Sequence, residues 1–202
     1  MYKPADLFLG IVDFFSVLVP GAILSYAVYA VYPSFVERIV PLDGNGAWFA
    51  LLFFSFFSGH VIARLAEYID KLWSSNTWLQ KNEELWNAVF RIREDLGRAT
   101  DSYAISIYQW CRSVLIVVSP EAMADINAVI ASADFFRNLY VVFPFAALVS
   151  FLGSQSTLGM VFIVMAALSL LLSEMSRHTL HKRICYHVIV LHMLGRLRPD
   201  AD

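Results

Sequence analysis

Long uncharged apolar stretches alternate with charged, amphipathic stretches along the chain. Residues 14–31, 47–63 and 138–173 contain no Asp, Glu, Lys or Arg. The turn-forming sequence GSQST interrupts the third stretch at residues 153–157 and divides it into two helices. A helix that crosses a bilayer needs about 20 residues, with a range near 17–25. The pattern therefore predicts four rather short transmembrane helices, at about 14–31, 47–63, 138–152 and 158–173.

The remaining residues predict helices outside the bilayer. Apolar residues recur close to helical spacing among charged residues at Leu79, Leu85, Val89, Ile92 and Leu96, which indicates an amphipathic helix. A second helix is expected over 103–118. Ser119-Pro120-Glu121 is a helix-start signal, and no break follows before Gly153. One helix is therefore expected to rise from residue 120 into the third span. The tail after residue 173 is basic and then amphipathic, and it either continues the fourth span or lies along the membrane.

These segments define the expected organisation of an all-α membrane protein. It comprises a first transmembrane hairpin (1–66), a helical cytoplasmic insert (67–136), a second transmembrane hairpin (137–173) and a basic amphipathic tail (174–202).

Composition supports the membrane interpretation. Hydrophobic residues make up 58% of the chain and charged residues 16%, whereas soluble domains average about 45–50% and about 25%. The net charge of −2 shows no basic footprint, so direct nucleic-acid binding is not expected. Cys111 and Cys185 stand far apart in no redox or zinc motif, which indicates buried free thiols. Because no catalytic motif is found either, we expect neither an enzyme nor a bound cofactor.

Lys and Arg are distributed unevenly between the predicted loops. The segment 64–137 carries eight of them and the tail after residue 173 carries five, whereas the loop 32–46 carries only Arg38. The positive-inside rule then predicts a multi-pass protein of the inner membrane with the insert and both termini in the cytoplasm.

Three features of the first hairpin are candidate functional positions. Pro20-Gly21 lies within the first span, where it favours a packing kink or a hinge: Pro20 removes the helical partner of the Ser16 carbonyl, and Gly21 admits a neighbouring backbone. Asp13 and His60 are polar groups expected at the same membrane depth, where they are either interfacial residues or a proton or ion site.

A second set of candidates follows the fourth span. Glu174, His178, His181 and Cys185 step by four, three and four residues, as does one face of a helix, and His192 follows them. Such a stripe can bind a metal or haem, but Glu174, His178 and His181 have no clear completing ligand, so no metal is expected. The basic residues Arg177, Lys182 and Arg183 favour contact with lipid headgroups or a partner.

The stretch DFFSVLVPGAIL at residues 13–24 resembles the first span of small multi-span membrane proteins from bacterial phage defence. These accompany type VI-B CRISPR effectors, and relatives of them accompany the RADAR adenosine-deaminase system. The resemblance also covers chain length, four spans and a cytoplasmic middle. It implies an oligomeric membrane protein that modulates a cytoplasmic antiviral effector and has no catalytic residues.

Three functional hypotheses follow from these observations. The first is a non-enzymatic inner-membrane protein that acts by homo-oligomeric assembly in the lipid bilayer, as a pore or as a modulator of a cytoplasmic defence effector. Small residues in the spans, such as Gly21, Ala22 and Gly59, favour it. The second is a small transporter or channel subunit that uses Asp13 and His60. The third is a membrane metal or haem redox protein built on the histidine stripe.

Overall fold

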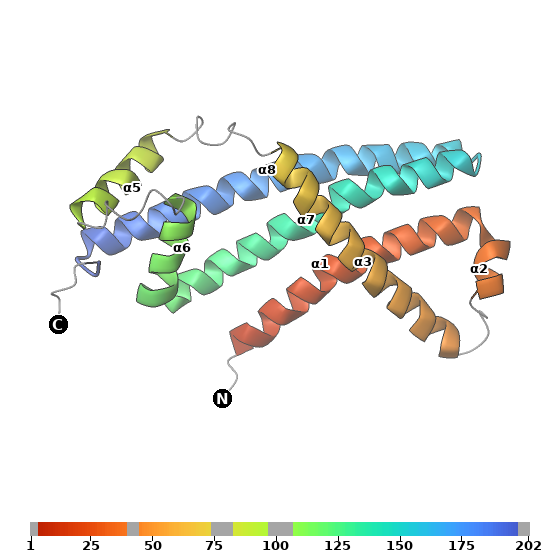
Figure 1. Cartoon of the computed structure of the whole chain (residues 1–202), viewed down its shortest axis with the longest axis horizontal. Helices are drawn as coiled ribbons and strands as arrows, with labels where there is room; N and C mark the ends of the chain where they lie inside the picture. The colour runs from red at the N-terminus through yellow and green to blue at the C-terminus, as the bar shows by residue number, and fades with distance from the viewer. Residues whose placement is uncertain (1–3, 40–44, 74–82, 97–106, 198–202) are drawn as a thin grey trace. The chain divides into compact units, whose positions relative to one another are not determined.

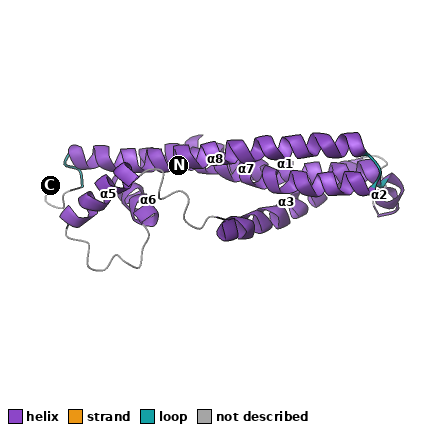
Figure 2. Cartoon of the chain, turned by 90° about the horizontal axis from the view of Figure 1, so that it is seen from above, coloured by secondary structure: helices purple, strands orange, loops and turns teal. Residues whose placement is uncertain are grey.

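The structure of the chain, a computed structural model, describes residues 4–39, 45–73, 83–96 and 107–197. These residues are helical and contain no strand (Figures 1 and 2), which confirms the predicted all-α fold. The helices are α1 (Pro4–Val31), α2 (Pro33–Ile39), α3 (Asn45–Trp73), α5 (Glu83–Asp95), α6 (Ile107–Val118), α7 (Pro120–Leu152) and α8 (Ser156–Met193). Four of them, α1, α3, α7 and α8, are long and apolar enough to cross a membrane.

The chain forms two compact units. We call the first the span unit (residues 1–73 and 131–175) and the second the insert unit (residues 74–130 and 176–202). The division at 130/131 falls inside α7 and the division at 175/176 falls inside α8, so each of these helices contributes to both units. The sequence pattern had placed the corresponding boundaries at 66/67, 136/137 and 173/174.

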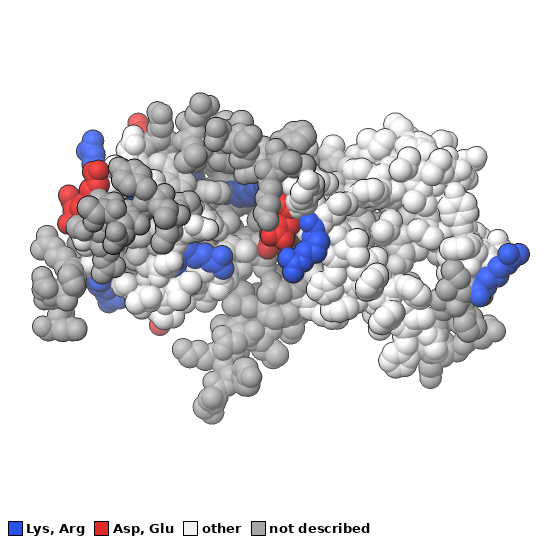
Figure 3. Space-filling model, viewed as in Figure 1, with Lys and Arg blue, Asp and Glu red and all other residues white. Residues whose placement is uncertain are grey.

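In the span unit, α3 packs through a narrow stripe of its surface. Its buried residues Ser55, Gly59, Ile62 and Ala66 step by four, three and four positions and form one helix face. The aromatic residues around this stripe are exposed, with Phe49 at 75%, Phe53 at 66% and Phe57 at 63%. On the face drawn in Figure 3, most of the surface of the span unit is formed by uncharged side chains. The unit therefore encloses only part of its apolar surface.

The span unit also has an apolar core. It is formed by residues of α1, α3, α7 and α8, with Phe143 stacked on Phe162 at a ring-centroid distance of 6.0 Å. The buried members are Ala27, Ile62, Ala66, Leu139, Val141, Val142, Phe143, Ala146, Ala147 and Phe162.

The insert unit has a core of its own. Val89 and Ile92 of α5 are buried, as the helical spacing predicts, and α6 contributes Trp110, Cys111 and Leu115. The start of α7 adds Met123 and Ile126, and the end of α8 adds its own apolar face. The buried α8 residues are Leu180, Ile184, Cys185, Val188 and Leu191. The amphipathic helices of this unit thus each bury one face in a shared core.

Several predicted boundaries are confirmed. The helix that begins after Ser119 runs without a break to Leu152, and the Ser119 carbonyl accepts the hydrogen bond from the Met123 amide (3.1 Å) that opens it. The tail continues the fourth span as a single helix to Met193. The short helix α2 was not predicted, since residues 32–46 were treated only as a loop between two spans. The expected starts of the two insert helices, near residues 79 and 103, lie outside the described residues.

Candidate functional site

The first span contains a backbone group that its own helix cannot satisfy. Proline has no N–H, so Pro20 cannot donate to the carbonyl of Ser16, four residues earlier. Both residues are buried, with Ser16 at 6% exposure. A buried carbonyl that lacks a hydrogen bond destabilises a protein by about 1–3 kcal/mol. The chain must therefore supply a donor at this point.

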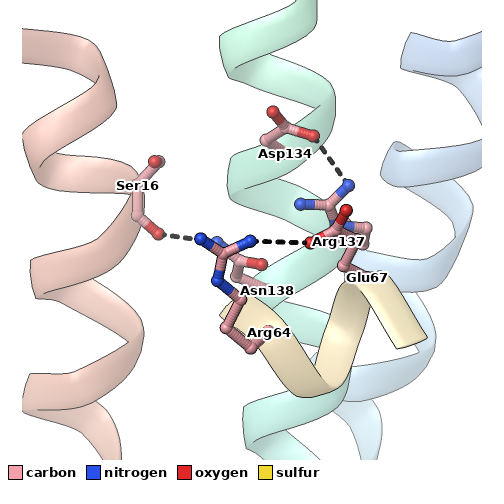
Figure 4. A network of polar contacts seen from close by, with 6 residues as sticks. All are labelled: Ser16, Arg64, Glu67, Asp134, Arg137 and Asn138. Carbon is pink, nitrogen blue, oxygen red and sulfur yellow. Dashed lines mark hydrogen bonds and ion pairs between the residues drawn. The ribbon is translucent and has the colours of Figure 1, made fainter. Parts of the chain in front are cut away.

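Asn138 of α7 supplies that donor. Its side-chain Nδ2 donates to the Ser16 carbonyl oxygen at 3.1 Å, across a separation of 122 residues in sequence (Figure 4). Asn138 is only 2% exposed, and its Oδ1 atom is buried without a hydrogen-bond partner among the described residues. The amide thus replaces the missing backbone N–H and joins α7 to α1 inside the span unit.

The residue after Pro20 brings α1 against α3. A Cβ atom placed on Gly21 would overlap the backbone carbonyl of Ser55, and one placed on Gly59 would overlap that of Val17. The hydroxyl of Ser58 donates to the Phe54 carbonyl at 2.7 Å, and its oxygen lies 3.3 Å from the Gly21 carbonyl oxygen. Only glycine permits backbones to approach this closely. Both glycines are therefore used for packing within one chain.

Two ion pairs lie near the buried amide, as Figure 4 shows. Arg137 contacts Asp134 at 2.9 Å on α7, and Arg64 contacts Glu67 at 3.2 Å on α3. Each pair is spaced i, i+3 and lies at least partly exposed, so it contributes little to stability. Together they mark where the uncharged part of the span unit ends.

The structure describes only one of the two side chains of the candidate ion site. His60 lies on the exposed side of α3, with its ring edge-on to Phe56 at 4.5 Å between centroids. Asp13 lies in α1, but its side chain is outside the described residues. The proposed pairing of Asp13 with His60 therefore stays a prediction.

A further polar contact holds the other end of α1. Gln155, in the turn between α7 and α8, donates from Nε2 to the Ala30 carbonyl at 2.9 Å. Gly153 of the same turn packs so closely on Val31 that a Cβ atom there would overlap its side chain. The turn thus satisfies one of the last carbonyls of α1, which have no partner within the helix.

The histidine stripe does not form a metal centre in the described part of the chain, where no three His, Cys, Asp or Glu side chains are grouped to hold a metal ion. His181 is half-buried beside the rings of Trp86 (6.2 Å) and Tyr108 (5.4 Å), and its Nδ1 lies 2.8 Å from the Arg177 carbonyl. Its ring therefore packs α8 against α5 and α6. Glu174 and His178 are half-buried.

The three basic candidates on α8 differ in their surroundings. Arg183 makes two contacts with the Asp125 carboxylate, at 2.9 and 3.0 Å, and His187 approaches the same carboxylate at 3.7 Å. Lys182 is exposed and Arg177 is half-buried. Of the three, Lys182 is best placed to meet a headgroup or a partner.

The two cysteines are free thiols buried in the core of the insert unit. Burial, assisted by the neighbouring Cys185, raises the pKa of the Cys111 thiol to about 12. Because the thiolate is the reactive form, Cys111 is inert at neutral pH.

The sequence predicts that Pro20 removes the helical donor to the Ser16 carbonyl, but it does not predict that Asn138 replaces this donor. Asn138 is the first residue of the uncharged stretch 138–173. A polar amide at the start of such a stretch is the sequence feature that could have indicated a buried hydrogen-bond donor. Gln155 was read only as a turn residue. Its role depends on the packing of α1, which the sequence pattern does not specify.

Comparison of the chain with known protein families, with characterised proteins and with solved structures gives no match.

Proposed function

We propose that the protein is a non-enzymatic, multi-pass protein of the bacterial inner membrane that anchors its insert unit at the cytoplasmic face and presents it to a soluble partner. The observation that carries this proposal is the contrast between the two units. The exposed surface of α3 is rich in phenylalanine, and α8 exposes a run of aliphatic residues from Met160 to Leu172. Lipid tails solvate such faces, whereas water does not.

The insert unit combines a core of its own with charged surface groups. Its helices α5 and α6 each bury one face in that core, although α6 leaves Ile116 and Val117 exposed, by 53 and 81%. The ion pair between Asp125 and Arg183 lies at the surface of the unit. The uneven distribution of Lys and Arg supports placing this unit in the cytoplasm.

A labelling experiment tests the membrane topology. Ser34→Cys in α2 and Ser113→Cys in α6 both place a thiol at an exposed position. We expect a membrane-impermeant maleimide to label Ser34→Cys in intact spheroplasts, and Ser113→Cys only after permeabilisation. The reverse pattern would overturn the orientation, and release of the protein by alkaline carbonate would overturn the membrane location.

Homo-oligomeric assembly remains part of the proposal, but its basis changes. Gly21 and Gly59 were expected to bring subunits together, and they instead pack α1 against α3 within one chain. An assembly would therefore use the exposed faces of α3 or α8. Native mass spectrometry in nanodiscs tests this directly, and the mass of a single chain throughout would contradict assembly.

The resemblance of residues 13–24 to phage-defence proteins supports a more specific partner, a cytoplasmic antiviral effector. When the full chain and such an effector are co-expressed, we expect the effector to co-purify with the chain. The exposed surface around Lys182 should make the contact. Equal retention by Lys182→Glu would argue against that surface.

A further inference from the structure

A shallow apolar depression lies on the outward surface of α3. It is lined by Phe57, His60, Val61, Arg64, Leu65 and Tyr68. Positions 57, 61, 64 and 68 follow one face of a helix, and Arg64 is the first charged residue after the uncharged stretch. The depression therefore runs from an apolar end to a cationic end, at the point where the predicted span ends.

The two ends have complementary chemistry. Phe57, Val61 and Leu65 are exposed by 63, 55 and 37% and offer apolar surface. At the other end, the Arg64 side chain is 85% exposed and Tyr68 is 62% exposed. A guanidinium is the preferred partner of a phosphate, and tyrosine favours the level of the lipid headgroups.

The length of the apolar end can be compared with that of a lipid chain. Positions 57 and 64 are separated by about 10 Å along the helix axis at 1.5 Å per residue. One leaflet of the hydrocarbon core is about 15 Å thick, half of the roughly 30 Å of a bilayer. An acyl chain whose phosphate lies at Arg64 would therefore cover the whole apolar end and extend about 5 Å beyond Phe57.

The neighbouring carboxylate of Glu67 uses only part of the hydrogen-bonding capacity of Arg64. Glu67 contacts Arg64 through one nitrogen, Nη1, at 3.2 Å, and the pair is exposed. A guanidinium has five N–H donors, and an exposed ion pair of this kind contributes about 0–1 kcal/mol. A phosphate can therefore bind beside Glu67 or displace it.

We infer that this surface binds one anionic phospholipid of the inner leaflet, with its acyl chain along Phe57 and Val61 and its phosphate at Arg64. The inference rests on the proposed membrane location. It adds a lipid site on α3 to the headgroup contacts expected for the basic residues of α8.

Native mass spectrometry of the full chain tests the site. The purified protein is mixed with palmitoyl-oleoyl phosphatidylglycerol or with phosphatidylcholine of the same acyl chains. We expect the wild type to retain phosphatidylglycerol preferentially, and Arg64→Gln to lower the ratio of the two retained lipids about tenfold, as loss of one charge-assisted hydrogen bond predicts. Arg64→Lys should keep most of the preference, because it keeps the charge. Arg38→Gln, which removes an exposed arginine from α2, is the matched control.

A second variant tests the apolar end. Val61→Ser should lower the retention of both lipids without changing their ratio. Circular dichroism and size-exclusion profiles establish that each variant folds, which is expected because these side chains point away from the buried stripe of α3.

The outcomes separate the lipid site from the membrane location. An unchanged lipid ratio in Arg64→Gln, or displacement of phosphatidylglycerol by glycerol phosphate alone, would overturn the lipid site. Equal retention of both lipids by the wild type would also overturn it while leaving the membrane location intact. If the wild type retained neither lipid, the lipid site would fail, whereas the proposed membrane location is tested separately by alkaline carbonate extraction.

Discussion

At the scale of single residues, the amide of Asn138 compensates for the hydrogen bond that Pro20 removes from α1. The Ser16 carbonyl is buried, and the donor comes from a helix more than a hundred residues away in sequence. Neighbouring side chains commonly satisfy carbonyls freed by proline in membrane helices. The residues Pro20 and Asn138 should therefore be coupled energetically.

A double-mutant cycle measures this coupling. Asn138→Ala should lower the free energy of unfolding by about 1–3 kcal/mol, because it removes the side-chain donor to the buried Ser16 carbonyl. Pro20→Ala restores a backbone N–H at position 20, so Asn138→Ala should be less damaging in that background. Thermal unfolding in detergent gives all four values. Additive effects of the two substitutions would show that the amide does not compensate for the proline.

The raised pKa of Cys111 predicts slow thiol chemistry. With a pKa of about 12, roughly one thiol in ten thousand is ionised at pH 8. We expect iodoacetamide at pH 8 to leave Cys111 unmodified in the folded protein and to label it after denaturation, as read by peptide mass spectrometry. Ser113→Cys, on the exposed side of the same helix, is the control and should react quickly. Comparable native rates for the two thiols would contradict burial.

The same pKa shift has a consequence for stability, with a sign that follows from linkage. The folded state favours the neutral thiol of Cys111. Its contribution to the free energy of unfolding is therefore fully present below the ordinary pKa of 9.0, and it is lost as the pH rises from 9 toward 12. The insert unit should therefore lose stability in alkaline solution in part through Cys111, and Cys111→Ala should reduce that pH dependence.

At the scale of secondary-structure elements, the crossing of α1 and α3 depends on two glycines. Gly59→Ala should destabilise the span unit by at least the 1–3 kcal/mol typical of overpacking, because the added methyl group meets the backbone of Val17. Gly46→Ala, in the first turn of the same helix, meets nothing within 4 Å and should be neutral or stabilising. Thermal unfolding compares the pair, and equal midpoints would contradict the close crossing.

Most elements could be predicted from the sequence because their signals are local. Charge-free stretches indicate the four long helices, and Ser119-Pro120 marks the start of α7. The end of α3 could not be placed, because α3 continues past the apolar stretch as regular helix. Likewise, the donor to the Ser16 carbonyl depends on which helix packs against Pro20. The local sequence pattern does not predict this packing.

At the scale of the whole molecule, the two units have separate cores. The core of the span unit consists of aliphatic and aromatic side chains of α1, α3, α7 and α8. The core of the insert unit contains residues of α5 and α6, which contribute nothing to the core of the span unit. Both units share α7 and α8, whose continuity connects them without an intervening loop.

Separate cores predict separate responses to mutation. Leu115→Ala removes a fully buried side chain from the insert unit and should destabilise it by about 2–5 kcal/mol. Hydrogen exchange measured by mass spectrometry in nanodiscs should then accelerate in α5 and α6 and stay unchanged in residues 14–31. Val142→Ala, a buried residue of the span unit, is the reciprocal control. Faster exchange in residues 14–31 of Leu115→Ala would show that the units unfold together.

The contact between Asn138 and Ser16 also sets an order of events during synthesis. Ser16 leaves the ribosome 122 residues before Asn138, and at about 5–20 residues per second this interval lasts roughly 6–24 seconds. Throughout that time α1 can already cross α3, but the Asn138 amide has not yet been synthesised. The hydrogen bond between α7 and α1 can therefore form only after the segment that contains Asn138 has followed the first hairpin out of the ribosome.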